Sequence, residues 1–249
     1  MARIIAVTLR KGGSGKTTTS VNLAMALSLK GKKTLLVDLD PQANATISVG
    51  IDPTNLAKHI NTLFTDINAK TEDAIIKTEF GLYILPSHPD LADTEAGMRA
   101  TQIGLLKGLL EPLDNVFDFI VIDTPPSESY LTVNALAVAD EVLIPLQAHF
   151  LALRGLQDVL DEVDQVKQGL NPKLKVAGIL PTMVSNRTNV SKMIIEEVKS
   201  KYPDLLYPLQ VDFSIKHAEA SLAGKPIVIY DPKHQGSLAY LQLAELIIK

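Results

Sequence analysis

One stretch near the N-terminus decides the fold: Leu9-Arg10-Lys11-Gly12-Gly13-Ser14-Gly15-Lys16-Thr17-Thr18. Its glycines allow positive φ angles and let backbone N–H groups come close to phosphate oxygens. The helical pattern that begins at Lys16 adds the partial positive charge of a helix N-terminus. Lys16 can reach the β- and γ-phosphates of a nucleotide, and the Thr17 hydroxyl can ligate Mg²⁺. The stretch therefore predicts a loop that binds nucleotide phosphates, which we name the phosphate loop (residues 9–18).

The phosphate loop departs from the usual Gly-x-x-x-x-Gly-Lys-Thr pattern at its start. Arg10 stands where the pattern has its first glycine, and Lys11 adds a second lysine to the loop. The strand before it, the helix after it and the Gly-Lys-Thr turn all favour a phosphate loop over a mere glycine-rich turn. By residue type alone, Lys11 reads as a solvated cation of that loop.

Continuous apolar runs alternate with helical patterns along the chain. Such runs are typical of parallel strands, which are covered on both faces. We expect strands at residues 4–7, 34–37, 82–85, 119–122, 142–144 and 176–180, and helices at residues 16–30, 101–112, 128–138, 153–169, 189–201 and 236–248. The alternation predicts a single α/β domain over residues 1–249, with a mostly parallel, twisted sheet flanked by helices. Because the first strand begins at about residue 3, we expect no DNA-reading domain before it.

Carboxylates follow two of the predicted strands. Asp38 and Asp40 end one strand at positions i and i+2, which point to the same side of an extended segment, and Asp123 ends another. Ligands of open α/β sheets bind beyond the carboxyl ends of strands, so these residues and the phosphate loop should meet at one crevice. Taken singly, each aspartate could equally be a helix cap or a turn former. Taken with the loop, they favour a nucleotide site.

Composition excludes several classes of protein. Hydrophobic residues make up 46% of the chain and the net charge is only −4, which excludes intrinsic disorder. The chain has no cysteine, so disulfides, thiolate metal sites and a cysteine nucleophile are excluded, and its five histidines lack metal-ligand spacing. No signal peptide and no apolar run of about 18 residues is present, so we expect a cytoplasmic protein.

Charge is distributed unevenly along the sequence. Residues 86–165 carry 14 Asp and Glu against 3 Lys and Arg, whereas residues 171–235 carry 9 Lys and Arg against 6 Asp and Glu. An acidic protein repels nucleic acid at long range, so any nucleic-acid binding would need a local basic face. From charge alone, a solvated charged surface is the simpler interpretation.

The motifs together resemble the ParA/MinD family of deviant Walker-A ATPases, and most closely its ParA (Soj-like) members. The segment Lys11–Thr19 is similar to the family's loop with its signature lysine, Val37–Thr46 to its second motif, and Ile122–Ser127 to its Walker B strand. Later landmarks are similar as well, at Pro145–Ala148, Pro181–Met183, Glu219-Ala220 and Gly224–Pro226. The resemblance spans nearly the whole chain.

The resemblance implies a weak ATP hydrolase that forms an ATP-dependent sandwich homodimer. Lys11 would reach the partner subunit's nucleotide, while Asp40, with Asp38 beside it, would position the attacking water. The implied ATP contacts are Lys11, Gly12, Gly13, Ser14, Gly15, Lys16, Thr17, Thr18, Met183 and Asp212, and the implied Mg²⁺ contacts, direct or through water, are Thr17, Asp38 and Asp123. Phosphoryl transfer depends on positioning and charge neutralisation, so the resemblance implies slow hydrolysis until the second Lys11 docks.

DNA binding is a further implication of the resemblance. Family dimers bind nonspecific DNA through basic residues of the C-terminal half, and the candidates here are Arg187, Lys192, Lys199, Lys201 and Lys216. The family often has Pro-Arg-Asn where this chain has Asp212-Phe213-Ser214, so one expected cation is missing. The implied function is to position or segregate a cargo on the nucleoid, either a plasmid, a chromosome origin or a protein body such as a carboxysome. A small adaptor protein would stimulate hydrolysis.

Two other classes of function remain open. A MinD-like ATPase for division-site placement would bind membranes, but the end of the chain, Leu246-Ile247-Ile248-Lys249, offers only one charge. We therefore expect no membrane partner. A metabolic enzyme on the same scaffold is the other class: a reductase iron protein would need cysteines for its cluster, and a synthetase would turn over ATP only with its substrate.

Overall fold

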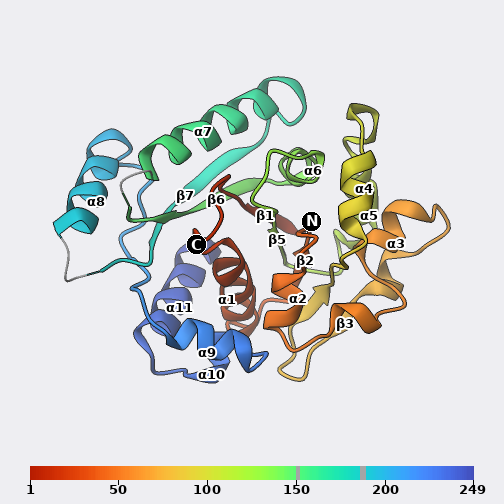
Figure 1. Cartoon of the computed structure of the whole chain (residues 1–249), viewed down its shortest axis with the longest axis horizontal. Coiled ribbons are helices and arrows are strands. Elements are labelled where there is room, and N and C mark those ends of the chain that lie inside the picture. Colours follow the sequence, from red (N-terminus) through yellow and green to blue (C-terminus); the bar gives the residue numbers. More distant parts are fainter. Residues whose placement is uncertain (150–151, 186–188) are drawn as a thin grey trace.

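The computed structural model describes residues 1–149, 152–185 and 189–249. Within them, seven strands form one sheet in the order β3-β4-β2-β5-β1-β6-β7 (Figure 1). The strands are β1 (Arg3–Val7), β2 (Thr34–Asp38), β3 (Ile76–Lys77), β4 (Tyr83–Leu85), β5 (Phe119–Asp123), β6 (Glu141–Gln147) and β7 (Lys175–Thr182). All neighbouring pairs are parallel except β3 with β4. The predicted α/β fold with a mostly parallel sheet is confirmed.

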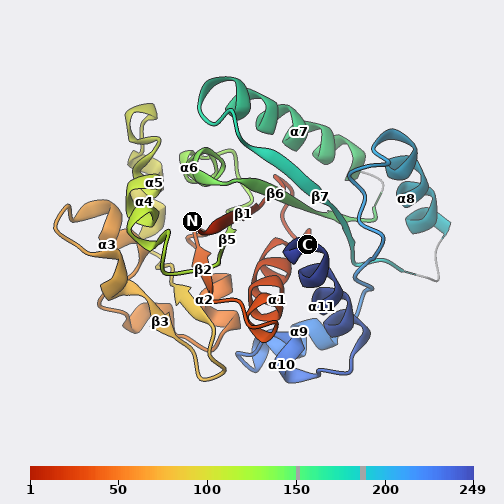
Figure 2. The ribbon, with the colours of Figure 1, turned by 180° about the vertical axis from the view of Figure 1, so that it is seen from behind.

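Helices cover both faces of the sheet. The larger ones are α1 (Lys16–Leu29), α6 (Tyr130–Val138), α7 (Ala152–Gly169), α8 (Asn189–Lys201) and α11 (Gln235–Ile248). Successive residues of a strand point to opposite faces, so in β1 Ile5 and Val7 pack with α1 and α11, whereas Ile4 and Ala6 pack with α6 and α7. Helices α1 and α11 lie side by side in both views (Figure 2).

The predicted helix at residues 101–112 is wrong in its extent. Only α5 (Leu105–Leu110) is α-helical there, and 3₁₀ turns flank it at Ala100–Gln102 and Glu111–Leu113. Gly104 precedes α5 with φ +104°, which no helix interior accepts, and Pro112 has no N–H for a helical hydrogen bond. The six strands and the other five helices that we predicted lie within about two residues of their expected bounds or extend them slightly.

Several short elements surround this framework. They are α2 (Asn44–Ser48), α3 (Ile60–Thr65), α4 (Leu91–Gly97), α9 (Lys216–Leu222) and α10 (Ile227–Tyr230), with 3₁₀ turns at Pro53–Asn55 and Thr71–Ala74. Across the described residues, none of the helices combines the length and apolar character that crossing a membrane requires.

Candidate functional site

The carboxyl ends of β1, β2 and β5 bring the predicted site together. Asp123 is the register partner of Val7 on one side and of Asp38 on the other. The phosphate loop leaves β1 at this same edge and enters α1 at Lys16. The sheet topology therefore places the loop and all three aspartates at one end of adjacent strands, as the sequence predicts.

The phosphate loop borders a cavity of about 390 Å³, which we name the phosphate cavity. Gly13 and Gly15 have φ of +70° and +88°, a conformation that most other residues avoid, and Gly15 is the N-cap of α1. The cavity is lined by Gly12, Gly13, Ser14, Gly15, Lys16, Thr17, Thr18, Asp40, Gln42, Asn44, Ile47, Ser48, Pro126, Met183 and Ser221. It thus combines a helix N-terminus with a lysine, the environment that phosphates favour.

Lys16 lies almost completely inside the protein, with 6% of its surface exposed. Its Nζ donates a hydrogen bond to the Lys11 carbonyl oxygen at 3.4 Å. Burial lowers the pKa of Lys16, while the charges of Asp123 and Asp40 oppose that shift. An ammonium with three donors in this position is suited to a bound anion.

The two aspartates at the end of β2 take different positions. Hydrogen bonding to β5 continues one residue past Asp38, since Leu39 N donates to the Asp123 carbonyl oxygen at 3.0 Å, and the chain turns only after Asp40, whose carbonyl oxygen accepts from Ala43 N at 2.8 Å. Asp38 Oδ2 accepts hydrogen bonds from Thr46 N and Thr46 Oγ1 at 2.8 and 2.7 Å, and Asp38 Oδ1 accepts one from Asp40 N at 3.1 Å. Asp40 lines the phosphate cavity, whereas Asp38 does not. Asp38 therefore holds the backbone at Asp40 and Thr46, and Asp40 faces the phosphate cavity.

Asp123 has the chemistry of a cation site. Its Oδ1 accepts a hydrogen bond from Ser20 Oγ at 2.8 Å, while its buried Oδ2 has no partner in the described part of the chain. Burial raises the pKa of Asp123, the charge of Asp38 raises it further, and hydrogen bonds from Ser20 and Thr17 oppose the shift. Mg²⁺ prefers carboxylate and hydroxyl oxygens and uses few of them beside phosphate oxygens. Thr17 and Asp123 therefore fit the ion.

Lys11 lies half-buried at the start of the loop. Its Nζ donates a hydrogen bond to Gln147 Oε1 at 3.2 Å, at the end of β6. The Lys11 side chain is therefore directed toward the end of β6, and Lys11 does not line the phosphate cavity.

A second cavity of about 340 Å³ continues from the phosphate cavity, since Gly15, Thr18, Met183 and Ser221 line both. Asp212 lines it, as does Phe213, whose surface is 68% exposed. Met183 has φ +50°, an uncommon conformation for a residue with a side chain. The two residues that the resemblance assigns to nucleotide binding here, Met183 and Asp212, thus share one cavity beside the phosphate loop.

Sequence reasoning missed the residues that hold the aspartates in place. Ser20 donates to Asp123, and Thr46 donates twice to Asp38. A signal for Ser20 exists, because it lies one helical turn beyond Lys16 on the same face of α1. No comparable pattern marks Thr46, whose contact depends on how the chain turns after β2.

The predicted DNA-binding residues do not form one cluster. Lys192, Lys199 and Lys201 lie on α8, Lys216 begins α9, and Arg187 lies outside the described residues. Helices α8 and α9 are apart in both views (Figures 1 and 2).

Two of these lysines form ion pairs within their own helices. Lys201 Nζ lies 2.9 Å from Glu197 Oε1, and Lys216 Nζ lies 2.6 Å from Glu219 Oε2. These carboxylates reduce the positive potential that the two lysines offer to a phosphate backbone.

Known proteins resemble this chain over its whole length. A family model described as an AAA domain matches residues 2–176. The sporulation initiation inhibitor protein Soj of Bacillus subtilis is 41% identical over 248 residues, which cover 98% of each chain. The chromosome partitioning protein ParA of Myxococcus xanthus is 41% identical over 253 residues, covering 100% of this chain and 89% of the relative. The crystal structure of cobyrinic acid a,c-diamide synthase from Mycobacterium smegmatis with bound ADP and magnesium has a TM-score of 0.86 at 36% identity, covering 100% of this chain and 94% of that one.

Proposed function

We propose a function on one premise: the chain belongs to the ParA/MinD family of deviant Walker-A ATPases. The protein binds ATP with Mg²⁺ and hydrolyses it to ADP and phosphate. One observation carries this proposal, namely that buried Lys16 and Asp40 face the same cavity as the phosphate loop, with Asp123 beside them. The ADP and magnesium bound to the Mycobacterium smegmatis structure support the choice of ligand.

Each group of the site has a proposed role. Lys16 and the backbone N–H groups of the loop neutralise the phosphates, and Thr17 and Asp123 hold Mg²⁺ directly or through its waters. The metal ion supplies additional positive charge to the phosphate oxygens. Asp40 orients a water toward the terminal phosphate, and Asp38 fixes the backbone that carries Asp40. Met183 and Asp212 border the cavity proposed for the nucleoside.

The position of Lys11 supports a proposal of dimerisation. Its side chain turns away from its own phosphate cavity, so its charge is available to a second copy of the chain facing the loop. We expect two ATP-bound subunits to pair across this face, each Lys11 reaching the other's phosphates. A lone subunit lacks that charge and hydrolyses ATP slowly.

The dimer positions or segregates a cargo on DNA. The names of the relatives support a role in chromosome partitioning, and α8 supplies lysines for nonspecific phosphate contacts. A small adaptor protein on the cargo stimulates hydrolysis, returns the subunits to monomers and releases them from DNA.

The test compares the wild-type protein with Lys11→Ala. Molar mass by light scattering is measured with ATP and with ADP, and hydrolysis is followed as phosphate release. We expect the wild type to double its mass with ATP only, and Lys11→Ala to bind ATP yet stay monomeric. Lys107→Ala, an exposed lysine on α5, is the matched control. A wild-type protein that binds ATP but stays monomeric contradicts the dimer proposal.

A second candidate function rests on the Mycobacterium smegmatis structure, whose name is that of a diamide synthase. A synthetase on this scaffold would hydrolyse ATP only when its small-molecule acid is present. Steady ATP hydrolysis by the isolated protein, stimulated by DNA rather than by small acids, speaks against that function.

A further inference from the structure

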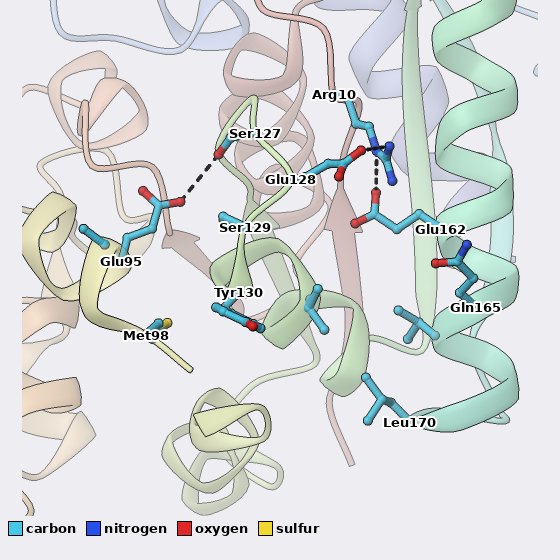
Figure 3. Close-up of a pocket in the computed structure, with 13 residues that line it drawn as sticks. Arg10, Glu95, Met98, Ser127, Glu128, Ser129, Tyr130, Glu162, Gln165 and Leu170 are labelled. Carbon is cyan, nitrogen blue, oxygen red and sulfur yellow. Dashed lines mark hydrogen bonds and ion pairs between the residues drawn. The ribbon is translucent and has the colours of Figure 1, made fainter. Parts of the chain in front are cut away.

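Arg10, the second residue of the phosphate loop, lies between two carboxylates. Its Nε donates to Glu162 Oε2 at 3.1 Å, and its Nη1 forms an ion pair with Glu128 Oε1. Figure 3 shows the three side chains converging, with Glu162 reaching across from α7 and Glu128 from the segment between β5 and α6. One guanidinium therefore joins the phosphate loop to two other parts of the fold.

The two carboxylates differ sharply in burial. The Glu162 side chain is 8% exposed, whereas that of Glu128 is 66% exposed. Exposed ion pairs contribute little, because water and salt screen them. A buried carboxylate needs a cation, and Arg10 is the one within ion-pair distance of Glu162 in the described part of the chain. Glu162 is therefore the group that fixes Arg10.

The neighbouring lysine attaches to the same part of the fold. Lys11 Nζ contacts Gln147 at the end of β6, and α7, which carries Glu162, is the next helix along the chain. The Lys11 carbonyl oxygen accepts from the Lys16 ammonium. The first half of the phosphate loop is thus attached through two side chains to β6 and α7. A glycine at position 10, as in the usual pattern, would offer no such attachment.

The Arg10 side chain also borders open space. It lines an open groove of about 740 Å³, together with Ser127 and Tyr130 on one side and Gln165 and Leu170 on the other (Figure 3). The Arg10 side chain is 30% exposed, and its ion pair with the buried Glu162 carboxylate fixes the guanidinium at the edge of this groove.

We propose that Glu162 is a positioning residue for ATP hydrolysis: through Arg10 it fixes the first half of the phosphate loop and, with it, the direction in which Lys11 extends. The inference rests on the proposed ATPase function. It assigns to α7 a part in setting the hydrolysis rate, although Glu162 does not line the phosphate cavity. Nucleotide affinity depends on Lys16 and the second half of the loop and should change little.

The test is a double-mutant cycle of Arg10→Met, Glu162→Met and the combined variant. Each protein is measured for ATP affinity, for kcat and KM of hydrolysis, and for melting temperature. Removing one partner of a buried ion pair destabilises the fold, whereas replacing both by apolar side chains is often neutral. Asp164→Asn, which removes an exposed carboxylate from the same helix, is the matched control.

We expect the combined variant to regain the melting temperature that Arg10→Met loses, while kcat stays low. Misplacing a catalytic group by about 1 Å can cost about 100-fold in rate. Because Glu162 acts on Lys11 only through Arg10, we expect a smaller loss of about 10-fold in kcat. ATP affinity should stay within about threefold of the wild-type value. The combined variant should be no slower than either single variant, because both act through one contact.

Four results overturn the inference. If kcat recovers together with the melting temperature, the ion pair is only structural. If the losses in kcat multiply, Glu162 does not act through Arg10. If the wild-type protein hydrolyses ATP and the variants have the same kcat, the inference fails while the proposed function stands. If the wild-type protein does not bind ATP, both the inference and the proposed function fail.

Discussion

Asp38 and Asp123 are direct register partners on the neighbouring strands β2 and β5, and both side chains are wholly buried. Burial raises the pKa of both carboxyl groups, and the charge of Asp38 raises the pKa of Asp123 further. Hydrogen bonds from Thr46 satisfy Asp38, but Asp123 Oδ2 has none from the described residues. Asp123 therefore keeps a buried oxygen for which the described residues provide no hydrogen-bond partner, and a divalent cation beside it would supply one.

The first prediction is that nucleotide and Mg²⁺ stabilise the protein together. At a concentration a hundredfold above Kd, a ligand adds about 2.7 kcal/mol to the free energy of unfolding, which shifts the melting temperature of a chain this long by about 5–10 °C. We expect ADP with Mg²⁺ to give such a shift and ADP with EDTA to give much less. Asp123→Asn keeps the shape but removes the charge, so its melting temperature with ADP should hardly respond to EDTA. An equal EDTA effect in the variant would place the ion elsewhere.

The second prediction concerns Lys16. Lys16→Ala removes the ammonium that faces the phosphate cavity, and ATP binding should be lost, as measured by calorimetry or by a fluorescent ATP analogue. Lys107→Ala on α5 serves as the control and should bind ATP as the wild type does. Micromolar affinity retained in Lys16→Ala would count against the assignment of the phosphate loop.

The third prediction separates Asp40 from Asp38. Asp40→Ala should bind ATP and dimerise normally, while its hydrolysis rate falls by about 10²–10⁴, the usual cost of losing a group that orients or activates water. Phosphate release at saturating ATP measures the loss. A normal rate in this variant would move the catalytic role to Asp38.

Asp38→Ala provides the contrast, because three hydrogen bonds end on this buried carboxylate. Each buried donor left without an acceptor costs about 1–3 kcal/mol. The variant should therefore unfold at lower denaturant concentration, whereas Asp40→Ala should not.

The division between these two aspartates shows where sequence reasoning stops. The i, i+2 spacing brought both residues to the correct edge of the sheet, but Asp38 accepts hydrogen bonds from Thr46 and Asp40, whereas Asp40 lines the phosphate cavity. The partner of Asp38 is Thr46, eight residues later, and no local pattern encodes that contact. The phosphate loop was predictable because its glycines and Lys16 interact within one short segment.

In the fold, too, elements with a strong local pattern were predictable and those without one were not. Six strands were predictable because parallel strands are buried on both faces and read as continuous apolar runs. Strand β3 was missed because this antiparallel edge strand has only two residues, Ile76–Lys77, and is too short to show a periodic pattern of apolar residues. The helix predicted at residues 101–112 was too long because the apolar residues there have helical spacing, although Gly104 and Pro112 do not fit a helix interior.

The fourth prediction is a loss of stability in acid caused by His217. Both of its ring nitrogens are buried without hydrogen-bond partners among the described residues, and burial, with a smaller contribution from the charge of His234, lowers its pKa to about 4. Below pH 6.5 the unfolded chain takes up a proton at His217 and the folded chain does not, so the free energy of unfolding falls as pH decreases from about 6.5 to 4.

The size of this effect is on the order of 2–3 kcal/mol at the acid end, since each pKa unit corresponds to about 1.4 kcal/mol. Urea unfolding at a series of pH values measures it. His217→Leu should flatten the curve, while His149→Ala, at an exposed position, should leave it unchanged. Parallel curves for the wild type and His217→Leu would show that other groups cause the acid sensitivity.

The last prediction concerns DNA. Lys192 and Lys199 are seven residues apart on α8, which places them on one face of the helix, and both are exposed. A single acidic subunit offers few such contacts, whereas an ATP dimer doubles them along one duplex and gains affinity by avidity. We expect fluorescence anisotropy to show nonspecific DNA binding with ATP only, falling by about 0.9 log units of affinity per log unit of salt for each phosphate neutralised. Changing both lysines to Glu should weaken binding and reduce that slope while sparing ATP affinity, and Lys107→Glu should not. If the ATP-bound protein ignores DNA at about 50 mM salt yet sediments with anionic vesicles, the nucleoid function is wrong and a MinD-like membrane function replaces it.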